Sequence, residues 1–343
     1  MTGKNANFRY RNTSVLSVTH IEAPVRIPSA RFEQHLATTR KRLRLPDNML
    51  ERISGVTERR WWEEGTRFDD PAIEAGAKAI AEAGVDPAGV GLLVNTSVTR
   101  TQLEPSVAVR VHHELSLPSS AMNFDIANAC LGFVNGMMLA ATMIDAGQID
   151  YALIVNSEDT RATQERTLAR LGRPEATRED YRREFASLTL GSGAAAAVLG
   201  RTDLHPNGHR IVGGVSRAAT EHHGLCVGNL EGMFTDTKGL LEGGLPLVVA
   251  AWDEANNGAG FQWDGMDRYI THQISTPYTQ AIIEAIELPA DRVPITFNHW
   301  GNVGPASLPM TLAAQAADLV PGDRVLCMGV GSGLNTAMLE LQW

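Results

Sequence analysis

The sequence predicts an α/β protein whose sheets and helices form layers, built from two similar halves. Strand-like and helix-like segments alternate along its 343 residues, which is typical of layered α/β folds. Residues 190–199 and 330–339, far apart in the chain, share a Gly-Ser-Gly turn that leads into a strand of small residues. This similarity indicates an internal duplication of a strand–helix–strand–strand unit, so that each half contains a mixed sheet.

The segments that precede these two stretches match in spacing as well. Cys130 opens a predicted helix, and a buried strand begins 20 residues later. Asn302 opens a second predicted helix, and the corresponding strand begins 21 residues later. We therefore expect the halves to span residues 1–206 and 207–343. Because two such halves pack their helices into a shared centre, Cys130 and Asn302 are expected to face one cleft.

The first half begins with segments of clear strand or helix character. In chain order these are a strand over 15–21, an arginine-rich helix over 29–43, a helix over 70–83 and a buried strand over 91–96. Pro71 near the start of the second helix and Gly84 after its end show the usual asymmetry of helix termini. Residues 103–106, Leu-Glu-Pro-Ser, open a further helix, and the helix dipole favours an acid such as Glu104 there.

Two arginines meet two tryptophans in the loop predicted over residues 53–62. Arg59 and Arg60 stand next to Trp61 and Trp62. Such a cluster suits a phosphorylated or adenine-bearing ligand through charge and stacking. A surface pair of arginines stacked on partly buried tryptophans is the commoner arrangement, and we favour it here.

Residues 122–147 form the central segment. A predicted buried strand and a sharp turn at Asn128 lead into a helix over 130–146 that has almost no polar face. At the start of a helix the unpaired N–H groups and the positive end of the dipole favour an anion, which would bias the Cys130 thiol towards the nucleophilic thiolate. The alternative role for Cys130 is that of a small core residue.

A strongly charged, arginine-rich stretch follows the next buried strand. We expect residues 159–185 to form an exposed insertion that contains a helix. The insertion would be either a lid over a ligand entrance or a solvated excursion, and the second is the commoner case.

The second half carries a histidine at the end of a strand predicted over residues 267–275. His272 is followed by Pro277, which starts a helix. A histidine at this position, opposite two helix starts, is well placed to polarise a thiol or a carbonyl group. A single histidine of this kind is usually structural, but its combination with Cys130 and Asn302 indicates catalysis.

The composition excludes several classes of protein. A net charge of −9 argues against a nucleic-acid-binding protein, which needs a basic face to release counterions. No segment has the length of a membrane span, and the N-terminus lacks the apolar region of a signal peptide. The cysteines Cys130, Cys226 and Cys327 form neither a disulfide framework nor a metal-ligand pattern. We expect a cytoplasmic protein without a bound metal.

Four ordered motifs carry a resemblance to a known family. The segments 128–133, 271–273, 298–307 and 329–335 resemble the thiolase superfamily, within it the branch of the β-ketoacyl-acyl-carrier-protein synthases III. More narrowly, the segments 103–106, 219–221, 225–230 and 235–237 resemble the OleA family, the condensing enzymes of long-chain olefin biosynthesis. This resemblance implies the thiolase fold, a duplicated five-layered α-β-α-β-α architecture, and a homodimer.

The resemblance also implies roles for individual residues. Cys130 matches the nucleophile that accepts an acyl group, and His272 and Asn302 match the pair that assists this transfer and binds the second thioester. The backbone N–H groups of Cys130 and Ser332 match the oxyanion hole. Glu104 matches a glutamate that acts as a base in the partner subunit's site.

The implied reaction is a Claisen condensation of two long-chain fatty acyl-CoAs without decarboxylation, giving a 2-alkyl-3-oxoacyl product. Coenzyme A thioesters are then substrates, no cofactor is needed, and other olefin-pathway enzymes are candidate partners. One departure concerns coenzyme A itself: Ile53 stands where synthases III use an arginine to contact it. How the nucleotide is held therefore stays open, with Arg59 and Arg60 as candidates.

Three alternatives compete with this interpretation. The nearest is a synthase III that condenses an acyl-CoA with a malonyl thioester, for which Glu104 is not required. A papain-like cysteine protease shares the chain order Cys, His, Asn, but the signature around its cysteine is missing. A scaffold without activity is disfavoured because Cys130, His272, Asn302 and Glu104 are all present.

Overall fold

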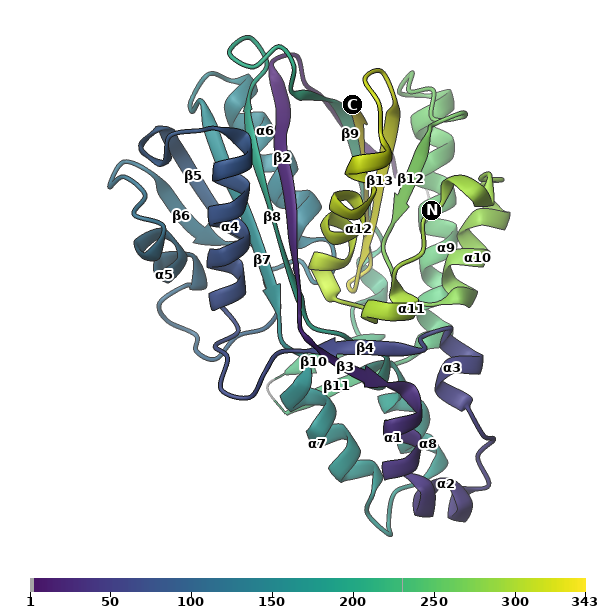
Figure 1. Cartoon of the computed structure of the whole chain (residues 1–343). Helices are drawn as coiled ribbons and strands as arrows, with labels where there is room; N and C mark the ends of the chain where they lie inside the picture. The colour runs from purple at the N-terminus through teal and green to yellow at the C-terminus, as the bar shows by residue number, and fades with distance from the viewer. Residues whose placement is uncertain (1–2, 230) are drawn as a thin grey trace.

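The computed structural model describes residues 3–229 and 231–343, so Leu230 at the end of the segment 225–230 lies outside the described residues. Its main element is a ten-stranded mixed sheet in the order β12-β13-β14-β9-β2-β8-β7-β5-β6, with β1 beside β9 (Figure 1). The strands are β1 (Ala6–Arg9), β2 (Thr13–Glu22), β5 (Val90–Asn95), β6 (Met122–Asp125), β7 (Tyr151–Glu158), β8 (Gly193–Arg201), β9 (His209–Ala218), β12 (Arg268–Thr271), β13 (Arg324–Gly331) and β14 (Asn335–Gln342).

The pairing of these strands occurs twice. In the first half β7 runs parallel to β5 and antiparallel to β8, which in turn pairs with β2. In the second half β13 runs parallel to β12 and antiparallel to β14, which in turn pairs with β9. A short contact between β2 and β9, at Ser14 and Val15, joins the two half-sheets. The duplication that the sequence predicted is therefore visible in the topology, and we propose a boundary at residues 206/207, in the turn between β8 and β9.

Helices cover both faces of the two half-sheets and thereby form five layers. Helices α4 and α5 pack on the outer face of the first half, and α9 and α10 on the outer face of the second. Helices α6 and α12 lie between the halves in one shared core, as the predicted architecture requires. The bounds of these helices are Asp70–Ala83 (α4), Val107–Glu114 (α5), Gly132–Asp145 (α6), Thr237–Asn257 (α9), Thr276–Ala285 (α10) and Ser307–Gln315 (α12).

The absence of a polar face on α6 follows from this central position. Most of the helix contributes to the core, including Phe133, Met137 and Ile144, and only a narrow strip with Leu139 and Thr142 is exposed. At Gly136 an added Cβ would lie 3.2 Å from side-chain carbons of both Ile154 and Thr96, so a small residue lets α6 approach the sheet closely. The helix begins at Gly132 and not at Cys130 as predicted.

A smaller group of elements, the lower lobe, lies below the layered body in Figure 1. Its core joins segments from both ends of the first half, among them Phe32, Trp61, Leu171 and Tyr181. The lobe contains β3 (Val25–Pro28), α1 (Ser29–His35), α2 (Ala37–Leu43), α3 (Met49–Ser54), β4 (Glu58–Trp61), α7 (Arg161–Leu171), α8 (Arg178–Glu184), β10 (Cys226–Asn229) and β11 (Gly232–Thr235).

The expected exposed insertion over 159–185 contains helices and is mostly exposed, as predicted, but it is not a solvated excursion. Leu171 and Tyr181 of the insertion are almost completely buried, because α7 and α8 pack against the segment that contains Phe32 and Trp61. Most of the charged residues occupy the outer faces of these helices, whereas Glu184 is buried and pairs with Arg170. The prediction of one helix over 29–43 was wrong, because this segment is divided at Leu36 into α1 and α2.

The remaining elements are short. They are α11 (Phe297–Trp300) and the 3-10 turns Pro87–Gly89, Phe185–Thr189, Thr220–His222, Ala290–Arg292, Gly304–Ala306 and Ala316–Asp318.

None of the described helices is long and apolar enough to cross a bilayer.

Arg59 is a structural residue of the lower lobe, so its assignment as a ligand-binding candidate was wrong. The segment is strand β4 and not a loop, and Arg59 is 0% exposed. Its guanidinium donates hydrogen bonds to Ile27 O, Ser29 Oγ and Leu188 O. Burial lowers the pKa of Arg59 to about 9. Arg60 pairs with Glu58 of the same strand and with Glu22 at the end of β2.

Replacing Arg59 tests this assignment. We expect Arg59→Gln to lower the free energy of unfolding by roughly 3 kcal/mol, because three buried acceptors lose a charged donor. Arg60→Gln is the matched control and should cost less than about 1 kcal/mol, since its ion pairs are partly exposed. Urea denaturation followed by circular dichroism measures both. Equal costs for the two variants would contradict the structural role of Arg59.

Candidate active site

Cys130 lies in a tight turn between strand β6 and helix α6. The N–H of Leu131 donates to Asn128 O at 3.0 Å and the N–H of Gly132 to Ala129 O at 3.1 Å. Ala129 adopts a positive φ of 45°, and Asn128 Nδ2 donates to Asn135 Oδ1 on α6. The turn is therefore held from both sides, and it places Cys130 at the carboxyl ends of the parallel strands β5, β6 and β7.

Ser332 comes next to this turn because the backbone after β13 packs directly on it. An added Cβ at Gly331 would lie 3.0 Å from Asn128 O and 3.1 Å from Leu131 Cβ, so only glycine fits without displacement. Asn335 Nδ2, just beyond, donates to Asn128 Oδ1 at 3.3 Å. The two halves of the chain thus meet where the sequence placed the oxyanion hole of Cys130 and Ser332.

His272 follows strand β12 at the same edge of the sheet. Thr271 pairs with Met328 of β13, and the N–H of His272 donates to Met328 O at 2.9 Å. The imidazole is 3% exposed, and its Nδ1 has no hydrogen-bond partner among the described residues. Burial lowers the pKa of His272 to about 4, so the ring is neutral at pH 7.

Gln273 connects the histidine with the segment that leads to Asn302. Its Nε2 donates to Thr271 O and to Pro294 O, both at 3.1 Å. Its Oε1 accepts hydrogen bonds from the N–H groups of Thr296 and Phe297. The sequence contained Gln273 only as part of a motif, and its bracing role appears in the folded structure.

Asn302 is fixed through its backbone and its side-chain oxygen. Its N–H donates to Thr189 O and its carbonyl accepts from Gly191 N–H, each at 2.9 Å. The side-chain Oδ1 accepts from Gly304 N–H at 2.9 Å and from Ser307 Oγ at 3.4 Å. This orientation leaves the Nδ2 group as the donor available to a substrate.

Cys130 and Asn302 occupy matching positions in the two halves. Each stands two residues before the glycine that begins the following helical segment, Gly132 for α6 and Gly304 for the 3-10 turn before α12. The repeat in the sequence predicted this correspondence.

The prediction of a thiolate-biased cysteine was wrong. Burial, together with the nearby Cys226 and Glu158, raises the pKa of Cys130 to about 12. The free-energy cost of desolvating a thiolate exceeds the stabilisation that the N-terminus of α6 provides, because this helix begins only at Gly132, two residues after Cys130. The thiol is therefore protonated at neutral pH and has to lose its proton as it attacks, and the neutral imidazole of His272 is suited to take it.

Two further buried groups lie near Cys130 and were missed by sequence reasoning. Glu158 ends strand β7, and burial raises its pKa to about 7. The hydroxyl of Tyr278 on α10 is buried without a hydrogen-bond partner among the described residues. The signal for Glu158 was an acid at the end of a strand that begins with an apolar run, while nothing in the sequence distinguished Tyr278.

Comparisons with known proteins agree with this arrangement. Residues 124–218 match the family 3-oxoacyl-acyl-carrier-protein (ACP) synthase III, and residues 257–343 match the C-terminal part of that family. An acyl-CoA:acyl-CoA alkyltransferase of Xanthomonas campestris is 40% identical over 97% of this chain and 99% of its own length. The chain belongs to the acyl-CoA:acyl-CoA alkyltransferase family.

Other relatives differ in their sequence identity to this alkyltransferase. The enzyme of the same name from Shewanella oneidensis is 34% identical over 98% of this chain and all of its own length. The crystal structure of a Xanthomonas campestris OleA variant with bound lauric acid and lauroyl-CoA matches with a TM-score of 0.95, at 40% identity, over 97% of this chain and 100% of that one. The β-ketoacyl-ACP synthase III of Staphylococcus haemolyticus is only 24% identical, over 92% of this chain and 94% of its own length.

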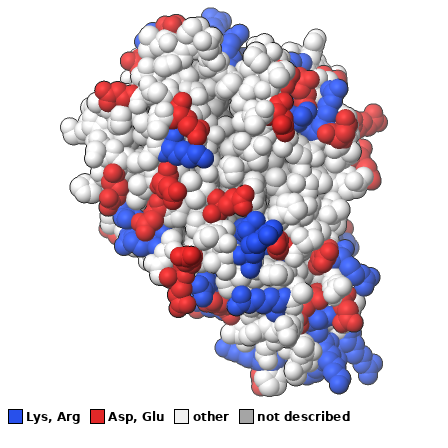
Figure 2. Space-filling view, viewed as in Figure 1, with Lys and Arg blue, Asp and Glu red and all other residues white. Residues whose placement is uncertain are grey.

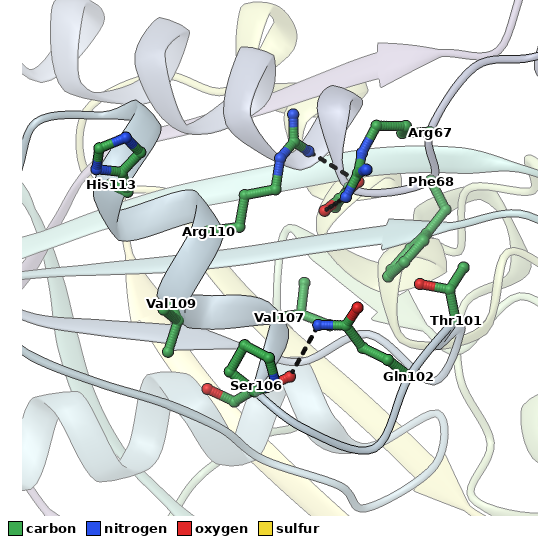
Figure 3. A pocket seen from close by; sticks show the side chains of 11 residues that line it. Arg67, Phe68, Thr101, Gln102, Ser106, Val107, Val109, Arg110 and His113 are labelled. Carbon is green, nitrogen blue, oxygen red and sulfur yellow. Dashed lines mark hydrogen bonds and ion pairs between the residues drawn. The ribbon is translucent and has the colours of Figure 1, made fainter.

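Glu104 does not lie in the candidate active site of its own subunit. It lies in the exposed stretch 101–105 of the loop between β5 and α5, and the adjacent Leu103 is 86% exposed. Figure 3 shows a cavity of about 280 Å³ at the base of this loop, lined by Gln102 and by Arg110 of α5. None of its lining residues comes from the segments around Cys130, so the cavity is separate from the candidate active site.

The low pKa of His272 predicts a pH-dependent stability. Unfolding restores its ordinary pKa of 6.5 from about 4, so the unfolded chain binds more protons between these values and stability falls as the pH drops below 6.5. The loss should reach roughly 2 kcal/mol between pH 7 and pH 5. In His272→Asn this part of the pH dependence should disappear, as measured by urea denaturation at both pH values. An unchanged pH dependence would contradict the buried neutral state.

Proposed function

We propose that this protein catalyses a Claisen condensation of two long-chain fatty acyl-CoAs without decarboxylation. The observation that carries the proposal is the meeting of the Cys130 turn with the Ser332 backbone, at the sheet edge that also presents His272 and Asn302. The named activity of relatives at 40% and 34% identity supports the same conclusion.

The first half-reaction transfers an acyl group to Cys130. The sulfur attacks the thioester carbonyl carbon, and the N–H groups of Cys130 and Ser332 stabilise the oxyanion. The carbon–sulfur bond to coenzyme A then breaks. The proton of the Cys130 thiol passes to His272 and from there to the departing thiolate of coenzyme A.

The second half-reaction forms the new carbon–carbon bond. A second acyl-CoA binds with its carbonyl oxygen near His272 and the Nδ2 group of Asn302. A carboxylate, Glu104 of the partner subunit, removes a proton from its α-carbon, and the resulting enolate attacks the acyl group on Cys130. The sulfur of Cys130 leaves as a thiolate and takes up the proton that Glu104 removed, which restores both groups. The product is a 2-alkyl-3-oxoacyl-CoA, which hydrolysis would convert to the β-keto acid.

A homodimer would complete the site. Strand β6 ends the sheet, and its first residue Met122 is 52% exposed. The exposed apolar residues Val98 and Leu103 belong to the neighbouring loop. An unpaired strand edge flanked by apolar side chains suits pairing with its own symmetric copy, which would carry Glu104 across the interface.

The further parts of the proposal concern substrate handling and setting. We propose that coenzyme A thioesters are substrates, that no cofactor takes part, and that the enzyme acts in the cytoplasm beside other enzymes of olefin synthesis. The described residues contain no metal-binding cluster of His, Cys, Asp or Glu. Lys and Arg gather over the lower lobe on the face shown in Figure 2, which would attract the anionic end of coenzyme A now that Arg59 is excluded.

Condensation with a malonyl thioester is the second candidate, because synthases III are distant relatives of this chain. Incubation with myristoyl-CoA alone and with myristoyl-CoA plus a malonyl thioester, analysed by mass spectrometry, separates the two. We expect condensed product in the first tube. Product only in the second tube would show a malonyl-dependent synthase, and no acylation in either would exclude both reactions.

Replacement of Cys130 tests the nucleophile. Cys130→Ala should reduce incorporation of radiolabelled acyl groups to background, because the proposed mechanism places the acyl group on the sulfur of Cys130. Cys327→Ala, in the buried strand β13, is the matched control and should keep normal labelling. Labelling of the Cys130→Ala variant at the normal level would disprove the assigned role, and peptide mapping distinguishes this outcome from minor labelling of the nearby Cys226.

Replacement of Glu104 separates the two half-reactions. Glu104→Gln should leave acylation of Cys130 within about twofold and lower condensation at least 10²-fold, since a positioned base contributes roughly that much. Glu74→Gln, an exposed carboxylate on α4, serves as control. Quenched-flow measurement of acyl-enzyme and product gives both rates, and normal condensation by Glu104→Gln would remove the residue from the mechanism.

A further inference from the structure

The loop that carries Glu104 is anchored at both ends by buried carboxylates. At its start, Glu158 accepts hydrogen bonds from Val98 N–H at 2.8 Å, Thr99 N–H at 3.0 Å and Thr99 Oγ1 at 2.7 Å. At its end, Asp125 accepts from the N–H groups at the start of α5. Asp125 also pairs with Arg100 at 2.8 Å. The exposed residues 101–105 therefore project from a fixed base.

Glu158 is the anchor that also borders the active site of its own subunit. Its Cγ lies 3.6 Å from the position of a Cβ added at Gly304, in the turn that Asn302 opens. The charge of Glu158 contributes to the raised pKa of Cys130. One buried carboxylate thus lies between the site of its own subunit and the loop directed at the partner.

The surroundings of Glu158 indicate a geometric role. Its carboxylate is held by neutral donors, the backbone of the loop, Thr99 and Asn156, and no ion pair involves it among the described residues. A buried carboxylate without a cation is costly in desolvation. Each of the short hydrogen bonds that Glu158 accepts comes from Val98 or Thr99 at the start of the loop. The buried carboxylate therefore fixes the position of that loop.

We propose that Glu158 is a positioning residue that acts in the partner subunit's reaction by fixing the loop that presents Glu104. The inference rests on the proposed function, in which Glu104 works across the dimer. Proton abstraction requires the carboxylate within hydrogen-bond reach of the α-carbon, and a displacement of about 1 Å costs on the order of 10²-fold in rate. Loosening the base of the loop should therefore slow condensation and spare acylation.

The variant Glu158→Gln retains the size of the side chain but turns an NH₂ group towards an N–H donor of Val98 or Thr99. We expect the loop to lose one of its anchoring bonds. In the homodimer this should lower condensation at least tenfold while acyl-enzyme still forms. A homodimer alone would not separate an effect on the partner from an effect on the neighbouring Cys130.

Mixed dimers with two affinity tags make that separation, because each contains one active Cys130. In the first dimer, one subunit carries Cys130→Ala and the other carries Glu158→Gln. Its active Cys130 receives Glu104 from the subunit whose Glu158 is intact, so activity should equal that of a reference dimer with Cys130→Ala in one subunit. In the second dimer, one subunit carries both Cys130→Ala and Glu158→Gln, and the active Cys130 faces the loosened loop.

We expect at least a tenfold loss of condensation in the second dimer and none in the first. A loss in the first dimer alone, an equal loss in both, or no loss in either would overturn the proposal. Thr99→Val removes the hydroxyl that donates to Glu158 at 2.7 Å and accepts from Asp159 N–H at 3.1 Å. It should give the same pattern with a smaller loss, and it does not alter Glu158 itself. Asp159→Asn is the matched control, since its carboxylate binds Arg161 N–H and Ser192 Oγ instead of the loop.

A second pair of mixed dimers, with Glu104→Gln in place of Glu158→Gln, tests the proposed function separately from the role of Glu158. If Glu104→Gln causes equal losses in both arrangements, the action of Glu104 across the dimer is disproved. If Glu104→Gln lowers activity only in the second arrangement and Glu158→Gln does not, the function stands and the role given to Glu158 is wrong.

Discussion

The constraint on which the structure depends is the burial of two helices, α6 and α12, between the halves of the sheet. Both contribute to one continuous core, so neither half can bury its inner face without the other. This packing fixes the turns that precede the two helices, and Cys130 and Asn302 lie in those turns. The close contact of Gly331 with the Cys130 turn then brings the backbone of Ser332, the proposed second donor of the oxyanion hole, next to that turn.

The same burial sets the protonation states that the chemistry uses. It raises the pKa of Cys130 to about 12 and lowers that of His272 to about 4, so thiol and imidazole are both neutral at pH 7. A neutral pair can transfer a proton when a thioester arrives, without maintaining separated charges in a dry site beforehand. Glu158 adds a carboxylate whose position joins this site to the loop of Glu104.

Local patterns predicted the fold well where one segment carries its own information. The helix predicted over residues 70–83 has the expected bounds, with α4 spanning Asp70–Ala83, and the two Gly-Ser-Gly strands predicted the repeated topology. The predictions for Arg59 and of a solvated excursion over residues 159–185 failed because composition does not show which face of a segment another segment covers. Arg59 is enclosed by groups from Ile27 and Leu188, which lie far apart in the chain.

The sequence by itself determined the kinds of reacting group, the elements that carry them and the family, because motif spacing and hydrophobic periodicity are properties of neighbouring residues. Only the tertiary structure decided that the thiol is protonated, that Glu158 anchors a loop and that Gln273 braces the histidine. These depend on desolvation and on hydrogen bonds between distant segments, such as the bond from Asn335 to Asn128 across 207 residues. Such partners are chosen by packing, and no local pattern encodes them.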